Sequence, residues 1–99
     1  MQHGANVNAA KIDTGVTPLF IASEQGHLPV VECLLQHSAD INTARTDTGS
    51  TPLFIACQKG HLPVVECLLQ RGAHVNAAKI DGATPLFIAS QYGHLPVVK

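Results

Sequence analysis

The chain has 99 residues, of which 45% are hydrophobic and 13% are charged, so it can fold as one domain with a core. Six Lys and Arg against seven Asp and Glu give a net charge of −1, which excludes the basic surface typical of nucleic-acid binding. The sequence also lacks a signal peptide and any apolar run near the ~20 residues of a membrane span, so we expect no membrane insertion. Three cysteines, an odd count, argue against a disulfide framework and favour an intracellular protein, cytoplasmic with the nucleus also compatible.

The first predicted helix begins at Thr17-Pro18. A Thr hydroxyl can cap free N–H groups, and Pro fits the first helical position. Gly26 is expected to end this helix, because Gly adopts a left-handed conformation without a Cβ clash.

A second helix is predicted from Pro29. Its apolar residues should form the buried side: Val30, Val31, Cys33, Leu34 and Leu35. Gly72 closes the equivalent helix in the next copy, where the first copy has Ser38. A residue other than Gly in a left-handed cap costs about 1 kcal/mol, so Ser38 is predicted to be a weak joint.

Turn-forming residues precede each predicted helix start, in "ANVNAAKIDTGV", "ADINTARTDTGS" and "AHVNAAKIDGA", and predict an extended loop. The whole pattern then recurs: Thr51 follows Thr17 by 34 residues, and Thr84 follows by 33 because the last loop is one residue shorter. Helices of about eight to ten residues are too short to be stable alone, so the copies are expected to stack. The expected units are 1–16, 17–50, 51–83 and 84–99, all in one domain.

The stretch "TPLFIACQKGHLPVVECLLQRGAHVNA", residues 51–77, resembles the ankyrin repeat, whose pattern is close to "G-x-TPLHxAAxxGHxxVVxLLLxxGAxVNA". The resemblance implies an all-α repeat solenoid of stacked helix-turn-helix units with β-hairpin finger loops. It also implies a non-enzymatic module that binds a protein partner on the concave face of the stack.

Three positions depart from the family pattern. Phe20, Phe54 and Phe87 replace its His, and we expect these rings to gain burial instead of a hydrogen bond. Ser23, Cys57 and Ser90 replace an Ala, and Cys33 and Cys67 replace a Leu. Cys33 and Cys67 are expected on the buried face, and Cys57 is expected to be less buried.

The two ends of the sequence are out of phase with the repeat. The segment "MQHGANVNAA" resembles the tail of an earlier repeat, and "GHLPVVK" stops within a predicted helix. We interpret the chain as a fragment of a longer array; a small complete protein is the alternative. Flanks without polar caps predict head-to-tail self-association.

The histidines and cysteines do not predict a catalytic or metal site. His27, His61 and His94 recur once per repeat, and stacked helices lie ~8–10 Å apart, too far to share one zinc with bonds of ~2.0–2.3 Å. A structural role is expected, with no metal and no cofactor. Asp13, Asp47 and Asp81 are interpreted as turn residues, and no catalytic signature is present, so we predict no enzymatic activity.

Positions that differ between near-identical copies predict the partner-binding surface. They lie in the loops and the first helices: Lys11, Ile12, Val16, Glu24, Gln25, Arg45, Thr46, Ser50, Gln58, Lys59, Lys79, Ile80, Gln91 and Tyr92. Tyr92 is the best single anchor, because Tyr is enriched at interface hot spots. The alternatives are ordinary solvated residues on a structural spacer, or a targeting segment of a larger enzyme or channel.

The resemblance further implies one modification site. Ankyrin loop Asn residues can be hydroxylated, typically with a Leu eight residues earlier and an acidic residue just before. Asn42 matches, with Leu34 and Asp40 in place, whereas Asn76 has His74 at the acidic position. We expect the Asn42 side chain to hydrogen-bond the backbone of its turn.

Overall fold

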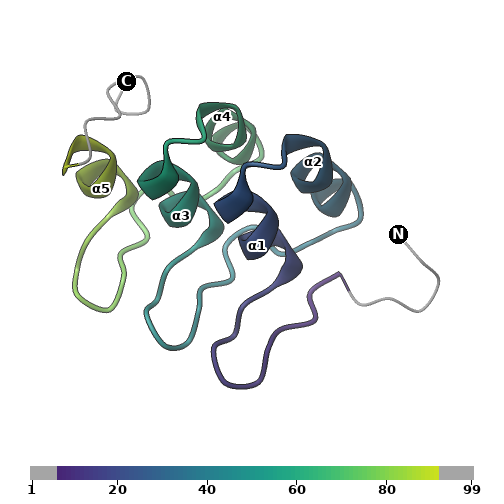
Figure 1. Cartoon of the computed structure of the whole chain (residues 1–99), viewed down its shortest axis with the longest axis horizontal. Helices are drawn as coiled ribbons and strands as arrows, with labels where there is room; N and C mark the ends of the chain where they lie inside the picture. Colours follow the sequence, from purple (N-terminus) through teal and green to yellow (C-terminus); the bar gives the residue numbers. More distant parts are fainter. Residues whose placement is uncertain (1–6, 92–99) are drawn as a thin grey trace.

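The computed structural model describes residues 7–91, and in this range it contains five helices. They are α1 (Pro18–Gln25), α2 (Leu28–Gln36), α3 (Pro52–Lys59), α4 (Leu62–Gln70) and α5 (Pro85–Gln91). Helices α1, α3 and α5 form one row and α2 and α4 form a second row above it in Figure 1, with the long loops projecting together to the opposite side. The predicted all-α repeat solenoid is confirmed.

The helix boundaries follow the predicted capping chemistry. Thr17 Oγ1 accepts a hydrogen bond from the Phe20 N–H (3.2 Å), and Thr51 caps α3 in the same way. Gly26 ends α1 in the left-handed conformation, with φ of 73°. Helix α2 begins at Leu28, one residue before Pro29, and its N-cap residue His27 makes no side-chain capping bond.

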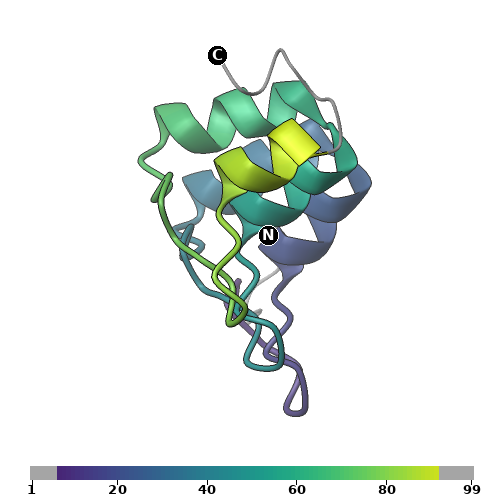
Figure 2. The ribbon, with the colours of Figure 1, turned by 90° about the vertical axis from the view of Figure 1, so that its left-hand side faces the viewer.

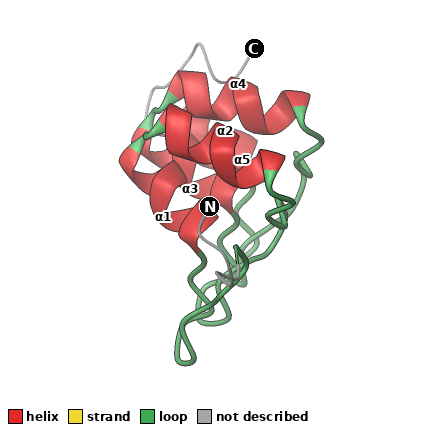
Figure 3. Ribbon diagram, turned by 90° about the vertical axis from the view of Figure 1, so that its right-hand side faces the viewer, coloured by secondary structure: helices red, strands yellow, loops and turns green. Residues whose placement is uncertain are grey.

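The three loops that we call fingers comprise residues 9–16, 43–50 and 77–83. Two backbone bonds close each finger at its base. Lys11, Arg45 and Lys79 donate their N–H groups to Val16 O, Ser50 O and Ala83 O at 2.9, 2.9 and 2.8 Å, and their carbonyl oxygens accept from the N–H groups of Gly15, Gly49 and Gly82 at 2.8, 2.9 and 2.9 Å. The predicted β-hairpins are therefore hydrogen-bonded turns, and residues 7–91 contain no strand (Figures 2 and 3). The bonds across each finger are too few to form a strand ladder.

The core lies between the two helix rows, where Leu19, Val31, Leu53 and Val64 are almost completely buried. Phe54 in the middle repeat is 1% exposed, so the expected gain in burial is confirmed there. Phe20 is buried in the same way, but Phe87 on α5 is 56% exposed. Burial therefore depends on whether a following repeat covers the ring.

Two expectations about burial were wrong. Val30 was expected inside but is 47% exposed, whereas Val64, its equivalent, is 0% exposed because α4 packs against α2. Among the described residues no helix precedes α1 and α2, so nothing there covers Val30. Cys57 was expected to be less buried than Cys33 and Cys67, yet it is buried and they are half-buried, because its position faces the packed core.

Ser23 offers a first test of packing. Its hydroxyl is completely buried and finds no hydrogen-bond partner among the described residues. Ser23→Ala should therefore raise the free energy of unfolding by about 1 kcal/mol, since an unsatisfied buried polar group is removed. Urea unfolding measures the change, and Ser90→Ala, at the exposed equivalent position, is the matched control with no expected effect. A loss of stability in Ser23→Ala would show that the hydroxyl is satisfied.

Ser38 has the left-handed backbone that its sequence position predicts. Its φ is 70°, and within the described range every other residue with positive φ is a glycine. Because left-handed backbone costs an L-residue about 1–2 kcal/mol, Ser38→Gly should stabilise the chain by about 1 kcal/mol after the entropy of Gly is subtracted. Thermal and urea unfolding would measure this gain, and an unchanged or lower stability would contradict it.

Candidate functional site

Neighbouring fingers are joined to each other by backbone hydrogen bonds. Thr46 N–H donates to Thr14 O at 2.8 Å, and one repeat later Ile80 N–H donates to Thr48 O at 2.9 Å. The two bonds occupy equivalent positions, so all three fingers lie side by side in a fixed register (Figure 1).

Asparagine side chains form a second link between repeats. Asn8 Oδ1 accepts from the Asp40 N–H at 2.7 Å, and Asn42 Oδ1 accepts from the His74 N–H at 2.9 Å. The side chain of Asn42 was expected to bond its own turn, and this was wrong: its partner lies in the next repeat. The Asn amide thus fixes the distance between successive loops.

His61 forms a third link. Its Nε2–H donates to the Glu24 carbonyl oxygen at 2.9 Å, and its ring lies against Gly26, where a Cβ atom would be 2.7 Å from Nδ1. His61 therefore has the expected structural role. His27 is exposed, and His94 lies outside the described residues. Within residues 7–91 no group of three or more potential metal ligands gathers.

Two basic side chains of the predicted surface hold the fingers to the helices. The Arg45 guanidinium lies 5.5 Å from the centre of the Phe20 ring, and Lys79 Nζ lies 5.1 Å from the centre of the Phe54 ring. Such cation–π contacts contribute about 0.5–1 kcal/mol at exposed sites. Arg45 and Lys79 are consequently half-buried and engaged within the chain.

Two of the three finger aspartates, Asp47 and Asp81, make contacts within their turns, as expected. Arg45 Nε and Nη2 donate to the two carboxylate oxygens of Asp47 at 2.8 and 2.6 Å, and this hydrogen bonding lowers the pKa of Asp47 below its usual value. Asp81 Oδ1 accepts from the Ala83 N–H at 3.0 Å, and Lys79 lies 3.7 Å from its other oxygen. These carboxylates stabilise the turns of their fingers.

The structure places the predicted partner-binding residues in three groups. The exposed ones are Lys11, Ile12, Gln25, Thr46, Lys59, Ile80 and Gln91, and the half-buried ones are Glu24, Arg45, Gln58 and Lys79. Val16 and Ser50 are buried, so their side chains cannot reach a partner and do not belong to an exposed surface. Tyr92, the predicted anchor, lies outside the described residues.

Ile12 and Ile80 are the notable members of the exposed group. Ile12, near the first finger tip, is fully exposed, and Ile80 in the third finger is 74% exposed. Sequence comparison between repeats selected both positions. Their exposure in the structure distinguishes them from the other selected residues, because isoleucine is usually buried.

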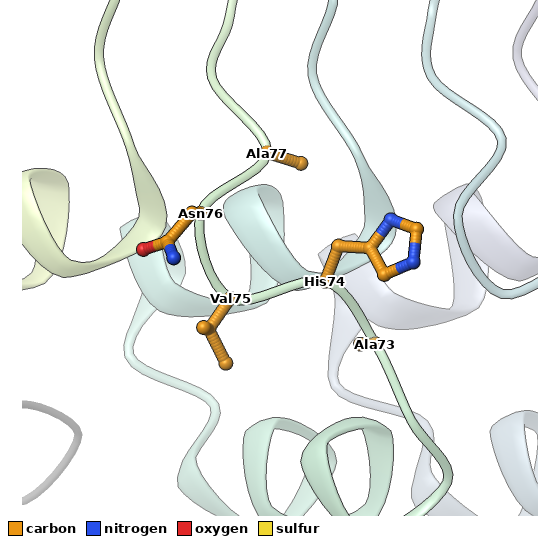
Figure 4. A pocket seen from close by; sticks show the side chains of 5 residues that line it. All are labelled: Ala73, His74, Val75, Asn76 and Ala77. Carbon is orange, nitrogen blue, oxygen red and sulfur yellow. The ribbon is translucent and has the colours of Figure 1, made fainter.

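A hollow of about 570 Å³ lies along the loop Ala73–Ala77, below the last finger. Figure 4 shows the Asn76 amide and the His74 ring pointing to opposite sides of this loop. The hollow is open and lined by this one loop, without a pair of groups suited to acid–base or nucleophilic chemistry.

Burial raises the pKa of the Cys57 thiol to about 11, from 9.0. Above about pH 9 the thiol ionises in the unfolded chain but stays protonated in the folded chain. The free energy of unfolding is therefore unaffected by the ionisation of Cys57 below about pH 9, and it falls as the pH rises towards 11, by up to ~1.4 kcal/mol per pH unit. Wild type should thus lose more stability than Cys57→Ala between about pH 8 and about pH 10.5. Urea unfolding at both pH values checks this, and equal losses would contradict it.

Comparison with known proteins gives one result. A family model described as ankyrin repeats (3 copies) matches residues 1–79 and, in an overlapping alignment, residues 43–99. A search of curated proteins gives no match. Among the helices of the described range, none has the length and apolar character to cross a membrane.

Proposed function

The chain belongs to the ankyrin repeat family, and we propose that it acts as repeats of this family generally do, by binding another protein. The family is typically non-enzymatic, and we propose the same for this chain. The partner would contact a surface that we call the tip row: Ile12, Thr46 and Ile80, one exposed residue from each finger.

One observation carries this proposal: the chain holds exposed isoleucines in a fixed row. The backbone bond from Thr46 N–H to Thr14 O joins the first two fingers, and that from Ile80 N–H to Thr48 O joins the second and third. A row fixed before binding loses little conformational entropy on contact with a partner, so its apolar area contributes more fully to affinity. Ile12 and Ile80 supply that area.

Polar residues of the first helices extend the surface. Gln25 on α1, Lys59 on α3 and Gln91 on α5 are exposed at equivalent or adjacent positions. They lie at the ends of these helices away from the fingers, and they would form a polar rim on the concave side of the stack beyond the tip row. Such a rim supplies specificity more than affinity.

Affinity capture followed by direct binding tests this function. Proteins retained from cell extract by wild type and lost with Ile12→Ser/Ile80→Ser are purified, and their affinity is measured by calorimetry. We expect the double variant to bind at least about tenfold more weakly, because two isoleucines no longer bury apolar area. Glu66→Gln, an exposed change on α4, is the control that should bind normally. Equal binding by all three proteins would overturn the tip row.

We further propose that copies of this chain associate head to tail. The observation that favours this is a pair of exposed apolar flanks: Leu86 and Phe87 at the α5 end, and Ile21 and Val30 at the α1 end. Their equivalents in the middle repeat, such as Leu53, Phe54 and Val64, are buried against neighbours. Three free cysteines suit the reducing intracellular setting that we propose for the chain.

Asn42 remains our proposal for a hydroxylation site. Its side chain is half-buried and bonded to the backbone of the next repeat, so the loop must open for an enzyme to reach it. Intact-mass analysis of natively expressed protein should show a species with one added oxygen, absent from Asn42→Ala. A single unmodified mass would contradict the proposal.

A further inference from the structure

We infer that Lys11 of one copy lies over the Phe87 ring of the preceding copy and sets the register of head-to-tail assembly. This inference rests on the proposed self-association and names the contact that directs it. It concerns two exposed residues at opposite ends of the described stack.

Two contacts within the chain define the geometry. Arg45, in the finger that leads into α3, lies over the Phe20 ring of α1, and Lys79, in the finger that leads into α5, lies over the Phe54 ring of α3. Each cation comes from the base of a finger, and each ring comes from the first helix of the helix pair that precedes this finger. Two successive interfaces of this molecule therefore use the same cation–ring pair.

The third ring and the third cation of this series are Phe87 and Lys11. Phe87 is 56% exposed, with no cation over it among the described residues. Lys11 occupies the position equivalent to Arg45 and Lys79, and it is exposed in the first finger. A second copy stacked as the next repeat would bring its Lys11 to Phe87.

An apolar series supports the same register. Ile55 packs with Phe20 and Val16 of the preceding repeat in one buried cluster. The equivalents across the proposed interface are Ile21 of the incoming copy, which is exposed, and Phe87 with Ala83 of the first copy. The proposed interface therefore pairs apolar side chains from both copies, in addition to the cation of Lys11 and the ring of Phe87.

The hollow at Ala73–Ala77 lies at the same end of the stack as Phe87, and it could also receive part of the incoming copy. Asn8 and Asn42 each accept a hydrogen bond from the backbone of the following repeat. Asn76 is the third member of that series, it is exposed, and it borders the hollow (Figure 4). An incoming backbone would fill this hollow in the way that His74 meets Asn42.

The two flanks are different surfaces, so the contact is heterologous and each added copy offers a fresh flank. Such an interface adds copies in one direction and does not close as a two-fold dimer. We therefore expect a concentration-dependent series of oligomers.

Sedimentation velocity over a concentration series tests the contact. Lys11→Met removes the charge and keeps the aliphatic stem, and Phe87→Leu removes the ring and keeps an apolar side chain. Each should weaken association about two- to fivefold, as expected for one exposed cation–π contact. The double variant should associate as tightly as the single variant with the larger loss of affinity, because both changes remove the same contact. Lys59→Met, an exposed lysine on α3, is the control.

The outcomes separate the two proposals. Wild type that stays monomeric at every concentration overturns self-association and this inference together. Association that is unaffected by Lys11→Met, or a double variant whose effects add, overturns the Lys11–Phe87 contact and leaves self-association intact. Neither outcome tests the tip row, because that surface is tested by the binding of a captured partner protein. Circular dichroism confirms that each variant folds, as expected for two exposed positions.

Discussion

Replacing Gly26 by Ala should lower the free energy of unfolding by about 2–5 kcal/mol. Gly26 has φ of 73°, and left-handed backbone alone costs an L-residue about 1–2 kcal/mol. In addition, the new Cβ atom would lie 2.7–2.9 Å from three atoms of the His61 ring. The ring is fixed by its bond to the Glu24 carbonyl, so it cannot move away without losing that bond, and overpacking adds about 1–3 kcal/mol.

Gly72→Ala is the matched control for this prediction. Gly72 also has positive φ, at 95°, but nothing lies within 4 Å of the position where its Cβ would be. Urea unfolding of both variants separates the backbone cost, which they share, from the collision with His61, which only Gly26→Ala has. Equal losses of stability would show that the ring does not restrict this position.

Phe54→Ala should cost about 3–5 kcal/mol, since truncating a buried aromatic side chain leaves a cavity. Phe54 is among the largest fully buried side chains, and Lys79 covers its ring. A loss of that size is a large share of the about 5–15 kcal/mol that stabilises a typical protein, so most of the variant should unfold at moderate temperature.

Phe87→Ala, at the equivalent but exposed position, is the control and should cost less than about 1 kcal/mol at a concentration where the chain is monomeric. Thermal unfolding followed by circular dichroism compares the two variants. Similar melting temperatures would mean that the middle repeat does not hold the stack together.

Features that depend on neighbouring residues were predictable from the sequence. The hydroxyl of Thr17 reaches the Phe20 N–H three residues away, and Gly26 ends the helix through its own backbone freedom. The stacking itself followed from repetition, because short helices need partners and identical copies supply them. These signals are local or periodic, so one sequence contains them.

Contacts between repeats were harder to predict, because they depend on the register of residues more than thirty positions apart. The bond from Asn42 to the His74 backbone and that from His61 to Glu24 are examples. The sequence indicated that these positions recur, but not which group each one meets. Similarly, variation between copies selected Arg45 and Lys79 as partner-binding residues, whereas they cover the rings of Phe20 and Phe54.

The sequence indicated that the two flanks of the stack lack polar caps, but it did not indicate which of their side chains are exposed. Val30 and Val64 have the same sequence neighbours, yet one is exposed and the other is buried. The difference arises from their place in the stack, which no local pattern encodes. The same reason separates Val16 and Ser50, which are buried, from the exposed variable positions beside them.

Amide hydrogen exchange of the free chain at low concentration tests most directly whether the tip row is held in place before binding. The Thr46 and Ile80 N–H groups bond to the preceding finger, so we expect slowed exchange at both. The Ile12 N–H, at the equivalent position of the first finger, has no such neighbour among the described residues and should exchange freely. Equally fast exchange at all three would show that the fingers move independently and would contradict a preorganised binding surface.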